Sequence, residues 1–79
     1  MPTLAIIDGY RFFFWSLDLG EPPHVHVEGH GGKAKFWLSP VELASSKGYN
    51  PRELNKIQQL VGEHAAEWME RWYEHFGRS

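Results

Sequence analysis

The chain has 79 residues, no cysteine and a net charge of −2, so it has room for one domain and excludes disulfide bridges and thiolate metal sites. The small negative charge gives no general support for binding the phosphate backbone of nucleic acids. No apolar run reaches the roughly 18 residues that a membrane span needs, and the start Met-Pro-Thr-Leu lacks the layout of a signal peptide. We therefore expect no membrane association and a location in a bacterial-type cytoplasm.

Two strands joined by a tight turn are predicted at the start of the chain. Residues 3–7 are largely apolar and end at Asp8-Gly9, a strong signal for a two-residue hairpin. Residues 10–17 are rich in aromatic side chains, which favour strands. Both faces of this second strand carry apolar side chains, so we expect it to be covered on both sides or to line a pocket.

A second hairpin is predicted from residues 24–28 and 33–38, with glycines between them. Small or apolar residues alternate with polar ones, which separates them onto opposite faces of an antiparallel sheet. The face toward the core is predicted to carry Val25, Val27, Ala34, Phe36 and Leu38. The other face is predicted to carry His24, His26, Glu28, Lys33, Lys35 and Trp37.

One long helix is predicted after an ambiguous segment. Residues 41–46 fit either a fifth edge strand or one helical turn. Residues 50–53 (Asn-Pro-Arg-Glu) are a favourable helix start, because Asn caps, Pro suits the first helical position and Glu is placed to complete a capping box. The apolar residues that follow recur on one helical stripe. The stripe continues across Gly62, so a single helix is predicted over residues 51–76.

These elements predict an α+β fold over one domain, residues 1–79: an antiparallel sheet of four to five strands with one long C-terminal helix packed on one face. A helix over residues 51–76 is about 39 Å long, whereas a compact chain of this size is only about 30 Å across. The helix is therefore expected to overhang the sheet and to need cover for its aromatic end, which predicts a homodimer or a complex with a second protein. The residues concerned are Trp68, Met69, Trp72, Tyr73 and Phe76.

His24, His26 and Glu28 fall on one side of a predicted strand, a pattern that suits a divalent transition metal with three nitrogen and oxygen ligands. Neighbouring side chains on one face of a strand lie about 6.5–7 Å apart, so all three do not easily converge on one ion. Two histidines with a ligand from a neighbouring strand are a more realistic set. The simpler interpretation is that these are half-exposed residues of the sheet surface.

The same two histidines are also candidate catalytic residues without a metal. His24 and His26 suit general acid and general base catalysis on a phosphodiester, with Arg11, Lys33 and Lys35 stabilising the negative charge. One hypothesis is therefore a small hydrolase that acts on phosphodiesters.

Aromatic residues beside the histidines suggest a binding surface. Phe13, Trp15 and Trp37 are placed to stack on the unpaired bases of a single strand, as aromatic residues on sheet surfaces do. The alternative is that these rings fill a second small core or a contact between subunits. The predicted binding residues are Arg11, Trp15, Glu28, Lys33, Lys35 and Trp37.

Four segments carry a resemblance to a known family: DGYRFFFWS at residues 8–16, EPPHVHVEG at 21–29, KAKFWL at 33–38 and NPRELNKI at 50–57. Together they resemble the small bacterial proteins of domain-of-unknown-function family 4160. The family is uncharacterised, so the resemblance, which covers essentially the whole chain, transfers no catalytic residues. Genes of this family often lie beside those of another uncharacterised family, number 2442, in pairs catalogued as toxin–antitoxin modules. The resemblance therefore implies a small partner protein.

Three functional hypotheses follow from the sequence. The first is an interaction protein of a two-gene, toxin–antitoxin-like module, with the His-x-His strand face as its functional surface. The second is a small nuclease or phosphoesterase that uses His24 and His26, with or without a divalent transition metal. The third is a nucleic-acid-binding regulator.

Overall fold

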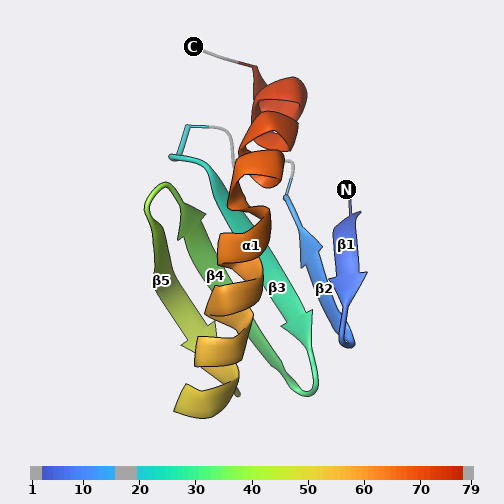
Figure 1. Ribbon diagram of the computed structural model, residues 1–79, viewed down its shortest axis with the longest axis vertical. Coiled ribbons are helices and arrows are strands. Elements are labelled where there is room, and N and C mark those ends of the chain that lie inside the picture. Colours follow the sequence, from blue (N-terminus) through green and yellow to red (C-terminus); the bar gives the residue numbers. More distant parts are fainter. Residues whose placement is uncertain (1–2, 16–19, 78–79) are drawn as a thin grey trace.

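The computed structural model describes residues 3–15 and 20–77 and consists of a five-stranded antiparallel sheet with one helix across one face (Figure 1). The strands lie side by side in chain order, each antiparallel to its neighbour. They are β1 (Thr3–Ile7), β2 (Tyr10–Phe13), β3 (His24–Gly29), β4 (Gly32–Leu38) and β5 (Val41–Lys47), and the helix is α1 (Pro51–Phe76). The predicted α+β fold is confirmed, and the ambiguous segment is an edge strand. No helix in the described residues is long and apolar enough to cross a membrane.

The second strand is shorter than its aromatic composition predicts. β2 ends at Phe13, opposite Thr3 of β1, whereas the sequence predicts a strand to residue 17. Phe14 and Trp15 continue the chain outside the ladder, and residues 16 and 17 lie outside the described residues. Because Thr3 is the first described residue of β1, the described part of β1 offers no further partner to β2.

Two tight turns at one end of the sheet set the register of the first and second hairpins. Asp8 and Gly9 have φ angles of 53° and 83°, and His30 and Gly31 have the same pair of values. Positive φ at both central residues is the mark of the turn whose twist matches paired strands. The two turns touch: a Cβ added to Gly29 would lie 2.5 Å from the carbonyl oxygen of Gly9. The predicted Asp-Gly hairpin is confirmed.

The core lies between α1 and the face of the sheet that the alternation pattern predicts. All five predicted core residues of the second hairpin are buried. The aromatic rings of β2 and the residue after it pack on the helix, with ring centroids 5.0 Å apart for Phe12 and Trp68 and 5.1 Å apart for Phe14 and Trp72. On the helix the buried residues are Ile57, Val61, Trp68 and Trp72.

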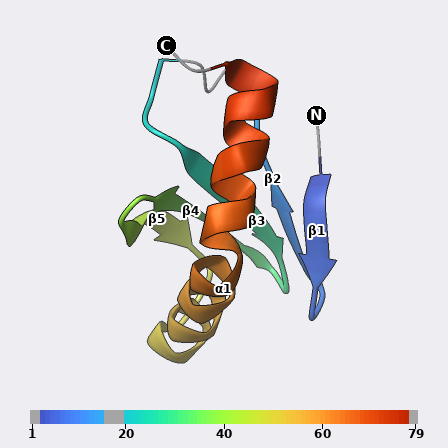
Figure 2. The same ribbon diagram turned by 45° about the horizontal axis from the view of Figure 1, so that its top comes forward.

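Two of the five apolar residues near the end of α1, Trp68 and Trp72, are covered by the chain itself, while Met69, Tyr73 and Phe76 are half-buried, so the homodimer or complex with a second protein stays a prediction. Trp68 and Trp72 are buried, and the ring of Phe76 lies 4.2 Å from that of Trp72. Part of the cover comes from Phe14, which follows β2, and from His24, which begins β3. Both rings contact that of Trp72. Figure 2 shows the chain before β3 rising beside the last turns of α1.

Polar contacts fix the start of α1 to the sheet. The side-chain oxygen of Asn50 accepts a hydrogen bond of 2.8 Å from the backbone N–H of Glu53, which confirms the predicted cap. The carboxylate of Glu53 accepts a hydrogen bond of 3.0 Å from the hydroxyl of Tyr10 on β2, instead of the predicted reach back to the cap. The hydroxyl of Tyr49 donates to the carbonyl oxygen of Gly29 at 2.8 Å.

These tyrosines predict a loss of stability in alkali. Burial raises the pKa of Tyr49 to about 12, with a smaller contribution from Tyr10, and burial also raises the pKa of Tyr10. A tyrosine whose pKa is higher in the folded state than in the unfolded state stabilises the folded state. This contribution is complete below the unfolded pKa, near 10, and is lost as the pH rises through the folded pKa. We therefore expect the free energy of unfolding to fall between about pH 10 and pH 12. Urea unfolding across this range measures it; an equally steep fall in Tyr49→Phe would contradict the assignment.

Candidate functional site

The face of the sheet opposite α1 gathers most of the predicted site residues, and we call it the open face. The strand register places its side chains in rows across β2, β3, β4 and β5. One row consists of Arg11, Glu28, Lys33 and Lys47, and the next of Phe13, His26, Lys35 and Ser45. A third row holds His24, Trp37 and Glu42, and Trp15 follows the end of β2.

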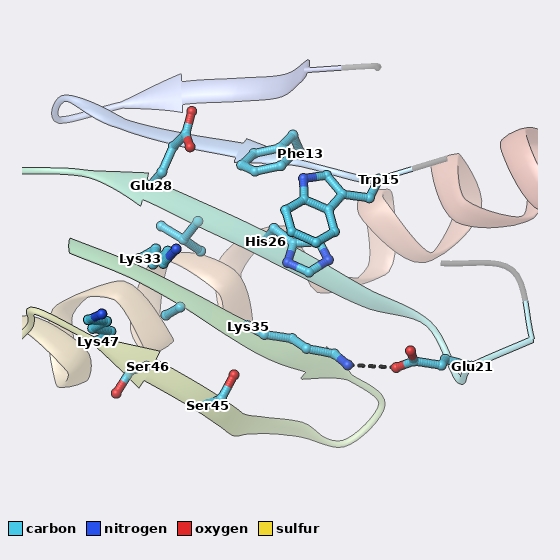
Figure 3. Close-up of a pocket in the computed structure, with 12 residues that line it drawn as sticks. Phe13, Trp15, Glu21, His26, Glu28, Lys33, Lys35, Ser45, Ser46 and Lys47 are labelled. Atoms are coloured by element: carbon cyan, nitrogen blue, oxygen red, sulfur yellow. Dashed lines mark hydrogen bonds and ion pairs between the residues drawn. The ribbon is translucent and has the colours of Figure 1, made fainter. Parts of the chain in front are cut away.

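Three rings on this face form a cluster that we call the aromatic stack: Phe13, Trp15 and His26. The ring of Trp15 lies 4.5 Å from that of His26 at an interplanar angle of 20°, and the ring of Phe13 lies 5.6 Å from that of His26 at 28°. Trp15 is 48% exposed, whereas Phe13 is only 5% exposed. Figure 3 shows the indole lying over the imidazole, so Trp15 presents a flat aromatic surface to solvent above a rigid support.

Two lysines lie directly opposite each other on neighbouring strands, and we call them the lysine pair: Lys33 on β4 and Lys47 on β5. Like charges at opposed positions of a sheet repel and destabilise it. Both lysines are exposed, and neither has an ion-pair partner among the described residues. By contrast, Lys35 pairs with Glu21 at 2.6 Å and Arg11 pairs with Glu28 at 2.8 Å.

The aromatic stack and the lysine pair line the same hollow, which has a volume of about 640 Å³. Its other walls are the Lys35–Glu21 ion pair and the serines of β5, Ser45 and Ser46 (Figure 3). A hollow of this size falls within the range of roughly 300–1,000 Å³ that holds small ligands. An exposed ring, two cations and the hydroxyl of Ser45 therefore lie around one space.

His24 is not on the exposed surface, so the expectation of two histidines side by side on the open face was wrong for this residue. Its side chain is completely buried, and its ring lies 5.0 Å from that of Trp72 on α1 and 5.5 Å from that of Trp37. Its Nδ1 lies 2.9 Å from the carbonyl oxygen of Pro22. Because a carbonyl only accepts, Nδ1 carries the proton. His24 is a core residue and does not reach a ligand in the hollow.

The predicted metal ligands are not brought together as a set of three, although the rings of His24 and His26 lie 5.1 Å apart. Glu28 binds Arg11 through Oε1, His24 is buried, and His26 is part of the aromatic stack. The side chain of His30, on the adjoining turn, contacts the backbone oxygen of Asp8 at 2.8 Å. Across residues 3–15 and 20–77, no three His, Asp or Glu side chains are grouped so as to hold a metal ion.

The predicted binding residues all lie on or beside the open face, but they differ in their contacts and in their exposure. Arg11 and Lys35 are engaged in ion pairs, and the ammonium of Lys35 also lies 4.6 Å above the ring of Trp37. Trp15 and Lys33 are exposed in the hollow. The sequence prediction missed Lys47, Ser45, Ser46 and Glu21. The register of β4 and β5 places Lys47 opposite Lys33, Ser45 opposite Lys35 and Ser46 opposite Ala34.

No curated protein and no solved structure matches this chain. A family model does match, over residues 9–73, and it spans every strand from β2 onward and most of α1. This range contains the whole hollow. The chain belongs to the family described as Domain of unknown function (DUF4160).

Proposed function

We propose that this protein binds single-stranded nucleic acid through its open face. The observation that carries the proposal is the placement of an exposed, supported tryptophan and an uncompensated lysine pair in one hollow. Proteins that bind single strands combine aromatic rings, on which bases stack, with cations that contact the backbone. Trp15 offers the ring, and Lys33 and Lys47 offer the cations.

The charge distribution supports binding on this face and not on the helix. The solvent side of α1 carries four exposed glutamates at helical spacing, Glu63, Glu67, Glu70 and Glu74, which repel phosphates. The open face holds the lysine pair. With Arg11 and Lys35, the open face carries four cations against the three carboxylates of Glu21, Glu28 and Glu42, and this excess of +1 favours a polyanion there over the glutamates of α1.

The edges of the sheet are less suited to binding than its face. Both edge strands contain an irregularity, where β1 shifts register between Thr3 and Ala5 and β5 shifts opposite Lys35 and Phe36. Bulges twist an edge away from a further strand and hinder strand addition. The shallow open face suits the flat bases of a single strand, whereas duplex bases are already stacked on one another.

Salt dependence tests this proposal. We expect an eight-nucleotide RNA of mixed sequence to bind more tightly than the corresponding duplex. Replacing both Lys33 and Lys47 by Ala should flatten the slope of log K against log salt by about 1.4, because each phosphate contact on a single strand contributes about 0.7. Fluorescence anisotropy of labelled RNA measures both quantities.

Arg52→Ala combined with Lys56→Ala is the matched control, since it removes two positive charges from the exposed start of α1. This control should leave the salt slope close to that of the unaltered protein. Equal slopes for the two double variants, or no binding of single-stranded RNA, would contradict the proposal.

A small partner protein, as in a two-gene toxin–antitoxin-like module, is a second candidate function. It is favoured by Ile6, which lies opposite Arg11 on the open face and is 70% exposed. With Trp15, it gives the β1–β2 side of this face exposed apolar area of the kind that interfaces bury. Co-purification of the tagged chain from its native host tests this candidate. If the Ile6→Lys variant co-purifies with the same partner as the unaltered chain, this surface does not bind the partner.

A further inference from the structure

The row of charged residues at the hollow carries a net charge of +2. Arg11, Lys33 and Lys47 contribute three positive charges and Glu28 contributes one negative charge. The guanidinium of Arg11 is satisfied locally, since it binds Glu28 at 2.8 Å and donates to the hydroxyl of Thr3 at 2.9 Å. The excess charge therefore belongs to the lysine pair.

The opposition of two lysines disfavours folding unless an anion lies between them. Directly opposed side chains on antiparallel strands have Cβ atoms about 4.5–5.5 Å apart, and like charges at such positions destabilise the sheet. An anion held between the two ammonium groups removes this repulsion. Ser45 lies opposite Lys35 on the same face and lines the same hollow, so a hydroxyl donor lies beside the cations.

We propose that the lysine pair binds a terminal phosphate, so that the hollow takes the phosphorylated end of a strand or a free nucleoside monophosphate. The inference rests on the proposed function and assigns the class of ligand. A phosphomonoester carries about −1.5 to −2 at pH 7, which matches the charge of +2, whereas an internal phosphodiester carries a single negative charge. Three oxygen acceptors of a terminal phosphate suit two ammonium groups and the neighbouring hydroxyl of Ser45.

The spacing between the two parts of the site fits one nucleotide. His26, which supports Trp15, lies opposite Lys35, so Lys33 is its diagonal neighbour across the β3–β4 ladder. Diagonal neighbours in a sheet are separated by about 7–8 Å. A base on the outer surface of Trp15 and a phosphate at Lys33 and Lys47 are therefore within the reach of a single nucleotide unit.

Matched probes test the assignment: adenosine, adenosine 5′-monophosphate, adenosine 3′-monophosphate, and the eight-nucleotide RNA with hydroxyls at both ends, with a 5′-phosphate or with a 3′-phosphate. Calorimetry and anisotropy give the affinities. We expect a terminal phosphate, at the 5′ or the 3′ end, to tighten binding by about tenfold or more through charged hydrogen bonds. In the Lys33→Ala, Lys47→Ala variant this preference should disappear, while hydroxyl-ended RNA still binds through Trp15.

The outcomes separate the two proposals. Equal affinity of the unaltered protein for phosphate-ended and hydroxyl-ended RNA would overturn the terminal-phosphate site and leave single-strand binding in place. A phosphate preference that persists without the two lysines would overturn their assignment. Failure of every RNA to bind while an adenosine monophosphate binds would overturn single-strand binding alone, and failure of every RNA and of both monophosphates would overturn both proposals. Circular dichroism of the double variant, with both lysines exposed, should match that of the unaltered protein and shows that the fold is kept.

Discussion

Replacing Trp68 by Ala is expected to destabilise the protein by about 3–5 kcal/mol, the usual cost of truncating a buried Trp. Trp68 is 1% exposed, and its ring lies 5.0 Å from those of both Phe12 and His64, so no neighbour can easily fill the space. The whole stability of a domain with 79 residues is about 4–12 kcal/mol. The midpoint of thermal unfolding should therefore fall by about 12–40 °C or the cooperative transition should be lost.

Trp15→Ala is the matched control for this prediction, because it removes the same side chain from an exposed position. It should change the free energy of unfolding by about 1 kcal/mol or less. Thermal unfolding followed by circular dichroism compares the two variants. Equal destabilisation by both substitutions would contradict the placement of α1 on the face opposite Trp15.

Binding of single-stranded RNA should weaken by about 5- to 150-fold when Trp15 is replaced by Ala, since stacking on an aromatic side chain contributes about 1–3 kcal/mol per base. The substitution uncovers Phe13 and His26, which then offer part of a stacking surface. The combined variant Trp15→Ala, His26→Ala should therefore approach the upper value. Trp15→Phe, which keeps a ring, should lose less than Trp15→Ala.

Leu43→Ala is the control for a general effect of lost apolar area. Leu43 is 40% exposed, but it pairs with Phe36 and so belongs to the face that carries α1. Its truncation should leave RNA affinity within about twofold of that of the unaltered protein. If Trp15→Ala binds RNA as tightly as Leu43→Ala does, the aromatic stack is not part of the binding site.

Most of the fold follows from local features of the sequence. The alternation of His24 to Glu28 predicts that Val25 and Val27 face the core, because side-chain direction in a strand has a period of two, and both are buried. The Asp8-Gly9 turn and the start of α1 at Pro51 are likewise set by the conformational preferences of a few neighbouring residues. Such features do not depend on distant parts of the chain.

His24 shows where local reasoning fails. Its position in the strand pattern is the same as that of His26, yet it is buried and His26 is only half-buried. The difference arises from Trp72, which lies 48 residues further along the chain and contacts His24 across the end of the sheet. Alternation predicts the direction of a side chain but not what covers it, so the predicted pair of catalytic histidines is not exposed.

The candidate site was only half predictable for a related reason. Trp15 and Lys33 belong to segments whose strand character is plain from the sequence. Lys47 and Ser45 depend on the register of β5, where Ala44 is an additional residue between the partners of Lys35 and Phe36. A slip of one residue moves every later side chain to the other face, and the ambiguous segment 41–46 gave no basis for choosing that register.

The most direct test of the open face as the functional surface is to map RNA contacts by NMR. Single-stranded RNA of eight nucleotides, titrated into the ¹⁵N-labelled protein, should shift the indole N–H of Trp15 and the backbone amides around His26, Lys33 and Lys47. The amides on the solvent side of α1, from Glu63 to Glu74, should not move. Shifts confined to α1, or no shifts at millimolar RNA, would contradict the proposal that this protein acts through its sheet.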